Sequence, residues 1–309
     1  MDIEEVLEGV EWILSQALLS DVMWVKQLPG GWDNLNYQIC MGDETYVVLK
    51  IWQAQPNVSD VETVIQRQLW ISEHGIPTAV PMMLVSGERY AVRDGLAWTL
   101  LPCVEGGHLG NDSASLHSLG AEMARLHEIP TADCFPTDYR MGWSLFGRMY
   151  RMAEEENSLS DFLVMLKRES GLLREIIPDD LPTGILHGDL FPDNVLGEGE
   201  VAAIIDFEES WIGPCAFDLV MAFVGFGWES GSPVVDRWDA LLSGYESVRK
   251  LTESERAALP ALHRYATLSI AAWRYWKHVM VEPHELLGKR YFEMVDRLET
   301  ELVFLGESD

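Results

Sequence analysis

Long apolar segments and paired cysteines are both scarce in this sequence. No apolar run approaches the about 18–20 residues that a membrane-spanning helix needs, and the first residues, "MDIEEVLEGVEWILSQ", lack the basic and apolar regions of a signal peptide. The cysteines, Cys40, Cys103, Cys134 and Cys215, form no CxxC pair. This scatter argues against a disulfide or zinc framework and predicts a reducing, cytoplasmic location.

Basic residues are also scarce. The chain has 22 Lys and Arg residues against 50 Asp and Glu residues, a formal net charge of -28. Such an acidic surface repels phosphate backbones and anionic headgroups, so we expect neither a nucleic-acid nor a membrane partner. Hydrophobic residues make up 48% of the 309 residues, which is enough for a real core. The length favours two domains or one large one.

Strand and turn signals dominate the first hundred residues, and helical periodicity dominates the rest. The amphipathic start and residues 59–74 predict helices, and the Gly-Asp of "MGDET" predicts a hairpin within residues 22–51. Further short strands are expected near 82–86, 90–93 and 96–101. Beyond a linker-like "LPCVEGGHLGN", the sequence predicts helices over 112–128, 143–156, 158–176, 215–228, 233–249 and 255–305.

This order of elements predicts an α+β chain of two lobes. The N-terminal lobe, residues 1–101, is expected to hold a small antiparallel sheet with one helix, and a hinge is expected at about 101–106. The larger C-terminal lobe, residues 107–309, is expected to be mainly helical. A cleft between two lobes is a common place for a ligand.

Polar side chains interrupt the helical part between two apolar runs. In "ILHGDLFPDNVL", residues 185–196, Asp189 precedes Asn194 by five positions, and Asp206 ends the next run, "VAAIIDF". A surface turn is one explanation. If instead the runs pair across "GEGE", Asn194 and Asp206 present neighbouring oxygens that suit Mg²⁺. Asp189 is then placed to accept a proton from an attacking hydroxyl, as phosphoryl transfer requires.

Together these motifs resemble the aminoglycoside phosphotransferase/choline kinase superfamily, which has a bilobal, protein-kinase-like fold. "LPGGWDNLNYQI" resembles its nucleotide-loop hairpin, "YVVLK" its lysine strand and "LLPCVEGGHL" its hinge. Within the superfamily, "HGDLFPDNVL" and "GYESVRKLTESERAALP", residues 244–260, are most similar to the kinase-like homoserine kinases. No GxxxxGK[ST] phosphate loop is present.

The resemblance implies ATP and Mg²⁺ as cofactors, with Asp189 as the catalytic base and Asn194 and Asp206 as metal ligands. The implied nucleotide contacts are Lys50 at the phosphates, Glu62 as the helix partner of Lys50 with Gln66 as the alternative, Gly30, Gly31 and Asn34 in the loop over the phosphates, and Leu101 and Cys103 at the adenine.

Several of these residues also fit purely structural roles. Ser59 and Glu62 match a capping box, and the two glycines match an ordinary hairpin turn. His187 is expected to hold the loop by hydrogen bonds, and Asp218 to brace the loop from below. The remaining candidates, His108, His117 and His127, are expected to be structural or on the surface.

The implied activity is phosphorylation of the hydroxyl of a small amino acid or amine, with homoserine favoured and a monomer or homodimer expected. Kinases of choline, ethanolamine, hydroxylysine or aminosugars are alternatives, as is a catalytically silent ATP-binding module. The intact catalytic positions argue against the silent module. The expected acceptor contacts are Glu208 and Glu209 for an ammonium, Arg274 for a carboxylate, and Trp211 or Trp276 for a cation–π face.

Overall fold

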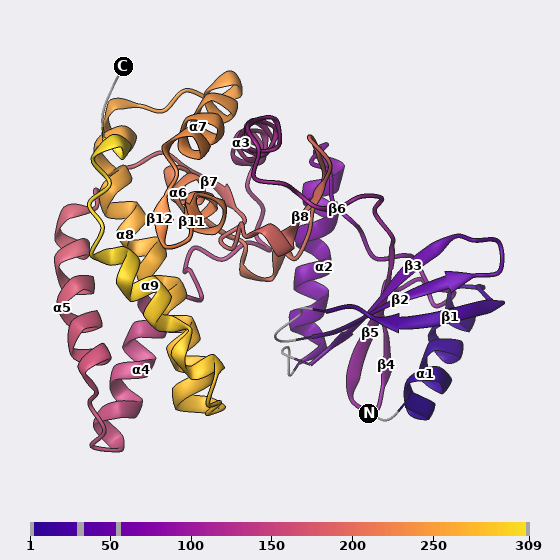
Figure 1. Ribbon diagram of the computed structural model, residues 1–309. Helices are drawn as coiled ribbons and strands as arrows, with labels where there is room; N and C mark the ends of the chain where they lie inside the picture. The colour runs from indigo at the N-terminus through magenta and orange to yellow at the C-terminus, as the bar shows by residue number, and fades with distance from the viewer. Residues whose placement is uncertain (1–2, 30–33, 54–56, 307–309) are drawn as a thin grey trace. The chain divides into compact units, whose positions relative to one another are not determined.

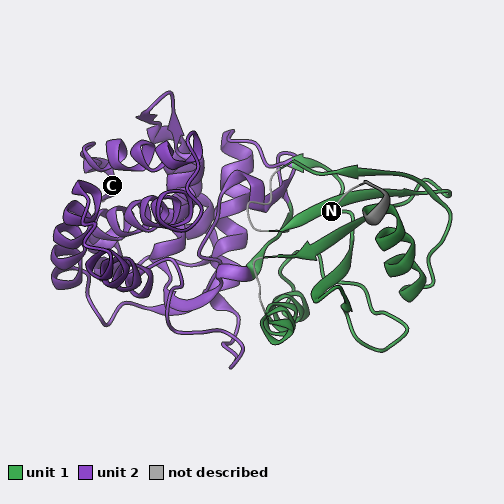
Figure 2. Cartoon of the chain, turned by 90° about the horizontal axis from the view of Figure 1, so that it is seen from below, with its two compact units in different colours: residues 1–107, 202–207 green, residues 108–201, 208–309 purple. Residues whose placement is uncertain are grey.

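The computed structural model describes residues 3–29, 34–53 and 57–306 (Figure 1). The chain divides into two units, residues 1–107 with 202–207 and residues 108–201 with 208–309 (Figure 2). The first boundary lies just beyond the expected hinge at 101–106. The grouping of 202–207 with the first unit was not expected from the sequence.

The first unit is built on a five-stranded antiparallel sheet. Its strand order is β1-β2-β3-β5-β4. The strands are β1 Val22–Gln27, β2 Leu35–Met41, β3 Tyr46–Trp52, β4 Ala91–Arg93 and β5 Leu96–Pro102. The predicted hairpin is confirmed, because β2 and β3 pair with Cys40 opposite Tyr46. Thr45 closes the turn by donating its backbone N–H to Asp43 Oδ1 at 3.0 Å.

The strand expected at residues 82–86 does not form. Met82 N donates to Leu100 O at 2.7 Å, but Leu84 N donates to Glu88 O at 2.8 Å. The chain therefore turns back after one contact with β5. Gly87, with φ at +87°, supplies the left-handed conformation that this turn needs.

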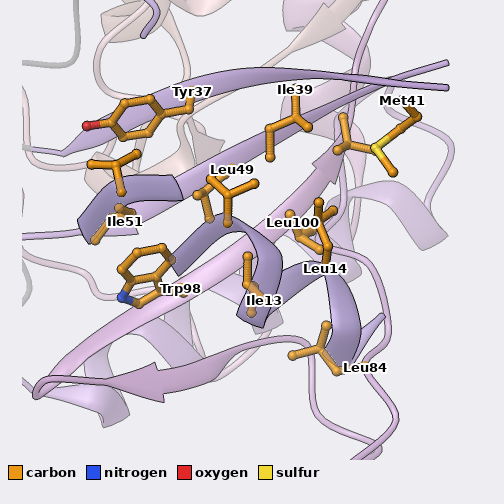
Figure 3. Packing of buried hydrophobic residues seen from close by; sticks show 13 residues of the cluster. Ile13, Leu14, Tyr37, Ile39, Met41, Leu49, Ile51, Leu84, Trp98 and Leu100 are labelled. Atoms are coloured by element: carbon orange, nitrogen blue, oxygen red, sulfur yellow. The ribbon is translucent and has the colours of Figure 1, made fainter. Parts of the chain in front are cut away.

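Two helices complete the first unit. Helix α1, Ile3–Gln16, buries Ile13 and Leu14 against sheet residues that include Leu49 and Leu100 (Figure 3). Helix α2, Val58–Glu73, buries Val61, Val64 and Ile65 against a smaller cluster with Trp52 and Ala97. The amphipathic start of the sequence is thus a core helix of this unit.

The capping box expected at Ser59 and Glu62 is wrong. Helix α2 begins at Val58, and its N-cap is Asn57, which makes no side-chain cap hydrogen bond. A capping box needs its hydroxyl residue at the N-cap itself. Ser59 lies inside the first turn, where its carbonyl oxygen instead accepts the Thr63 hydroxyl at 2.9 Å.

The second unit is mainly helical, as the sequence predicts. Its helices are α3 Ser113–Glu128, α4 Trp143–Glu155, α5 Asp161–Ile176, α6 Ala216–Phe226, α7 Val235–Val248, α8 Glu253–Tyr275 and α9 Tyr291–Leu298. The single helix expected over 255–305 is interrupted, because α8 passes into a π-helical segment at Trp276–Val281. Glu282 and then Pro283 follow, and a proline has no N–H to continue a helix.

Short strands flank the polar segment that the sequence singled out. Strands β7 Thr183–Leu186 and β10 Trp211–Pro214 pair antiparallel, with Leu186 opposite Trp211. They hold together the two ends of residues 187–210. The remaining short strands are β6 Gly107–His108, β8 Val195–Gly197, β9 Val201–Ile204, β11 Trp228–Glu229 and β12 Ser232–Pro233. None of the described helices is both long and apolar enough to cross a membrane.

Candidate active site

The loop that follows β7 is held through its backbone by Asp218. His187 N donates to Asp218 Oδ2 at 2.6 Å, and Gly188 N donates to Asp218 Oδ1 at 2.9 Å. Asp218 lies in the first turn of α6 and is completely buried. A buried carboxylate needs hydrogen bonds to replace its lost hydration. The prediction that Asp218 braces this loop is confirmed.

The next contacts fix the turn just before Asp189. Gly188 has φ at +82°, and a Cβ there would lie 2.8 Å from Glu209 O. Its carbonyl oxygen accepts the Tyr139 hydroxyl at 2.6 Å. Burial raises the pKa of Tyr139 well above its usual value, so this hydroxyl stays a neutral donor. His187 is fully buried, and its Nδ1 accepts Asp189 N at 3.2 Å, as expected of a structural histidine.

Asp189 and Asn194 are joined by two hydrogen bonds. Asn194 Nδ2 donates to Asp189 O at 2.8 Å and to Asp189 Oδ2 at 3.1 Å. A 3₁₀ turn, Pro192–Asn194, brings the two residues together. The contact limits the rotation of the Asp189 carboxylate. Because the amide nitrogen of Asn194 is engaged there, its amide oxygen is the atom that can bind a cation.

Lys50 and Asp206 form an ion pair in the first unit. Lys50 Nζ lies 3.1 Å from Asp206 Oδ1, and the two side chains are 12% and 41% exposed. Lys50 comes from the central strand β3, and the segment before Asp206 is anchored where Ile204 N donates to Pro77 O at 2.8 Å. Asp206 has φ at +67°, a sparsely populated conformation for a residue with a side chain.

The carboxylate of Asp206 and the amide oxygen of Asn194 are each of a donor type that a small divalent cation binds. Mg²⁺ prefers carboxylate and amide oxygens, and it keeps waters or phosphates as its remaining ligands. Within the described parts of the chain, no group of three or more His, Cys, Asp or Glu residues could hold a metal ion alone. A site completed by phosphate oxygens is consistent with so few protein ligands. Asn194 and Asp206 belong to different units, so their predicted proximity stays a prediction.

The expected nucleotide residues lie mostly around the sheet of the first unit. Asn34 is buried, and its Oδ1 accepts Gln53 N at 2.9 Å, next to the end of β3. Leu101 lies in β5 opposite Val48. Cys103 N donates to Tyr46 O at 3.4 Å. The other two loop positions, Gly30 and Gly31, lie outside the described residues.

Glu62 has a partner that the sequence did not suggest. Its Oε1 accepts the Tyr90 hydroxyl, and this hydrogen bond raises the pKa of Tyr90 to about 12. Lys50 pairs with Asp206, and its Nζ lies over the Trp52 ring, 4.1 Å from the ring centroid. The pairing of Lys50 with Glu62, or with the exposed Gln66, stays a prediction.

Arg274 and Glu209, two of the expected acceptor residues, already have charged partners. Arg274 Nη1 lies 2.9 Å from Glu293 Oε2. Burial lowers the pKa of Arg274, and the charges of Glu293 and, more weakly, Asp189 oppose that shift. Both carboxylate oxygens of Glu209 accept hydrogen bonds from Arg140, which the sequence did not single out.

Aromatic candidates for the acceptor site are packed against other residues. Trp211 is 7% exposed and stacks on Tyr139 at 5.2 Å between ring centroids. Arg148 lies over the ring of Trp276 at 5.4 Å. Neither Tyr139 nor Arg140 carries a local signal in the sequence, because both act through contacts with residues far along the chain.

The loop carboxylate of Asp189 and the strand lysine Lys50 are features typical of a phosphotransferase. Comparison with known proteins finds the same class. Residues 24–251 match the model of the phosphotransferase enzyme family, and the chain belongs to that family. It is similar to a homoserine kinase of Phenylobacterium zucineum (strain HLK1), at 29% identity over 272 residues that cover 84% of each chain. These findings identify a small-molecule phosphotransferase.

Solved structures confirm the predicted fold. An amicoumacin kinase in complex with AMP-PNP and Ca²⁺ superposes with a TM-score of 0.72 at 15% identity, covering 96% of this chain and 94% of that one. A choline/ethanolamine kinase family protein from Mesorhizobium loti superposes with a TM-score of 0.71 at 16% identity, covering 95% of both chains. The fold is therefore α+β and protein-kinase-like.

Proposed function

We propose that this chain transfers the γ-phosphoryl group of ATP, with Mg²⁺, to the hydroxyl of homoserine. One observation carries the proposal. Asp189 lies on a loop whose backbone is held by Asp218, and its carboxylate is oriented by Asn194. Such a positioned carboxylate is the group that phosphoryl transfer to an alcohol needs.

In the proposed reaction, Asp189 orients the acceptor hydroxyl and accepts its proton as the bond to phosphorus forms. Lys50 places its positive charge at the phosphates of the donor. Asn194 and Asp206 would hold Mg²⁺, whose charge offsets the negative charge of those phosphates. Asp206 also keeps Lys50 in place through their ion pair.

Homoserine is favoured over a simple amine by the homoserine kinase relative and by Arg274. A zwitterionic acceptor needs a cation for its carboxylate and an anion for its ammonium. Arg274 lies in the same unit as Asp189, and an acceptor carboxylate would share its guanidinium with Glu293. Glu208 and Glu209 are the candidates for the ammonium, and Arg140 already pairs with Glu209. The free cysteines support the cytoplasmic location that we propose for this enzyme.

The first test is turnover of ATP and Mg²⁺ with a panel of acceptors: homoserine, choline, ethanolamine, hydroxylysine and an aminosugar. We expect O-phosphohomoserine, identified by mass spectrometry. Asp189→Asn should lower kcat by about 10²–10⁴, because the side chain keeps its shape but loses the general base. ATP affinity should hardly change.

Asp193→Asn is the matched control, since Asp193 is an exposed carboxylate of the same loop. It should keep wild-type turnover. If Asp189→Asn retained turnover within a few-fold of wild type, Asp189 would not be the base. If the enzyme turned over an amine without a carboxylate but not homoserine, the assignment of homoserine as acceptor would be wrong. The assignment as a kinase would stand.

A further inference from the structure

Besides the backbone of the loop that carries Asp189, called the catalytic loop below, Asp218 contacts a buried ionisable side chain. His127, near the end of α3, places its Nε2 3.4 Å from Asp218 Oδ2 and its Nδ1 2.8 Å from the Tyr245 hydroxyl. Both imidazole and carboxylate are fully buried. Burial by itself disfavours the imidazolium, but contacts that include the hydrogen bond to Asp218 hold the pKa of His127 well above its usual value.

The chain of polar contacts continues beyond His127. Arg249 Nη1 donates to the Tyr245 hydroxyl oxygen at 3.1 Å, and Arg249 Nη2 donates to Glu255 Oε1 at 2.8 Å. The other oxygen of Glu255 accepts Thr252 N at 2.9 Å as part of the capping box of α8. The contacts thus link the start of α8 to the end of α7, then to α3, α6 and the catalytic loop.

These groups form a continuous set of polar contacts inside the second unit. Asp218 and Glu255, whose side chains are fully buried, stand at its two ends, paired with His127 and Arg249. Burial raises the pKa of Tyr245, so its hydroxyl stays neutral and links His127 to Arg249 by hydrogen bonds. Breaking one link leaves a buried charge without its partner, and the remaining members must move to recover one.

We propose that Tyr245, Arg249 and Glu255 are positioning residues for phosphoryl transfer, acting through His127 and Asp218 on the loop that carries Asp189. All three lie in residues 244–260, the stretch that resembles homoserine kinases and contributes no residue to the site described above. The inference rests on the proposed role of Asp189. It gives that stretch a function in catalysis without any contact with the acceptor.

The test is Tyr245→Phe, which keeps the ring and removes only the hydroxyl. By analogy with the outer partners of metal ligands, whose loss typically costs about 10- to 100-fold, we expect kcat to fall about tenfold. KM for ATP and for the acceptor should stay unchanged, because the residue touches neither. Hydrogen–deuterium exchange of the peptide 185–191 should become faster, because the hydrogen bonds from His187 N and Gly188 N to Asp218 weaken.

Tyr150→Phe is the matched control. It removes a hydroxyl of α4 that forms a hydrogen bond with Ser170 of α5, outside this chain of contacts. It should change neither kcat nor exchange of 185–191. Glu255→Gln is the second variant. It should reproduce the Tyr245→Phe effect, and the double variant should lose less than the product of the two single losses.

The outcomes separate this inference from the proposed function. Wild-type exchange of 185–191 in Tyr245→Phe, or a kcat within twofold of wild type, would overturn the inference while leaving the kinase assignment intact. An equal loss in Tyr150→Phe would overturn it too. If the wild-type protein phosphorylates no acceptor on the panel, the proposed function fails, and the exchange experiment still decides whether this chain of contacts holds the loop.

Discussion

At the scale of single residues, the candidate site depends on two backbone positions that most side chains avoid. Gly188 precedes the proposed base with φ at +82°, and the proposed metal ligand Asp206 has φ at +67°. Glycine adopts this region freely, whereas an aspartate there costs free energy. The ion pair with Lys50 contributes to holding Asp206 in that conformation. Such local strain is typical of sites that keep a functional side chain in a fixed direction.

His263, which takes no part in the candidate site, is expected to contribute to the loss of stability in acid. His263 is a buried residue of α8 whose Nε2 has no hydrogen-bond partner among the described residues. Burial, with the positive charges of Arg297 and Arg264, lowers its pKa to about 3. In the unfolded chain the pKa is about 6.5. Above pH 6.5 this histidine takes nothing from the free energy of unfolding. As the pH falls from 6.5 toward 3, the free energy of unfolding decreases, because only the unfolded chain gains the proton.

Each pH unit below 6.5 should therefore cost about 1.4 kcal/mol of the free energy of unfolding from this histidine alone. Urea unfolding from pH 7.5 to 4.5 measures the loss. His263→Gln should flatten the slope, while His108→Gln, which replaces an exposed histidine, should leave the wild-type slope unchanged. Identical slopes in all three proteins would show that His263 takes up its proton without unfolding.

At the scale of helices, α3 and α7 cross with their backbones in contact. A Cβ at Gly244 of α7 would overlap the carbonyl oxygen of His117, and a Cβ at Gly120 of α3 would overlap that of Leu241. Only glycine allows so close an approach. The crossing also fixes α3 against α7 near the contact between His127 and Tyr245, which needs both helices in register.

Gly244→Ala should therefore destabilise the protein although alanine favours helices. Overpacking of this kind costs about 1–3 kcal/mol, more than the about 1 kcal/mol that alanine gains over glycine in a helix. Gly171→Ala in α5 is the control, because a Cβ there meets nothing within 4 Å. It should be neutral or stabilising. Urea midpoints compare the variants, and equal stability of both would mean that the two helices separate at little cost.

The elements that sequence alone predicted are those whose signals are local. Helices α3 to α7 agree with their predicted ranges to within about three residues, because apolar periodicity and caps such as Asp112 lie within each segment. The hairpin of β2 and β3 follows from its turn residues. The strand expected at 82–86 failed because the chain turns at Ser86 and Gly87, a local turn signal that outweighed the apolar residues before it.

The candidate site divides in the same way. The loop motif singled out Asp189 and Asn194, which hydrogen bonds join, and the helix that follows singled out Asp218, whose carboxylate holds the loop backbone. The pairing of Arg140 with Glu209 could not be predicted, because the two residues are 69 positions apart and neither belongs to a motif. Long-range ion pairs depend on packing, so a sequence pattern alone gives no signal for them.

At the scale of the whole molecule, the imbalance of charge is a cost to stability. A net charge of -28 means that the folded chain gathers repelling carboxylates that the unfolded chain can separate. Local ion pairs such as Arg264 with Glu169 offset part of this repulsion. With 22 basic residues for 50 acidic ones, there are too few basic residues to pair one to one with every carboxylate.

Added salt should therefore raise the thermal stability of this protein. The screening length falls from about 30 Å at 0.01 M salt to about 8 Å at 0.15 M, which suppresses repulsion between distant carboxylates. We expect Tm at pH 8 to rise on the order of 5 °C over this range of NaCl, since 1 kcal/mol corresponds to roughly 2–4 °C for a chain of this size. The control is the same titration at pH 5.5, closer to the sequence pI of about 4.5, where fewer net charges repel and the rise should shrink. A Tm that is flat or falls with salt at pH 8 would mean that attractive ion pairs, which salt also screens, outweigh the repulsion.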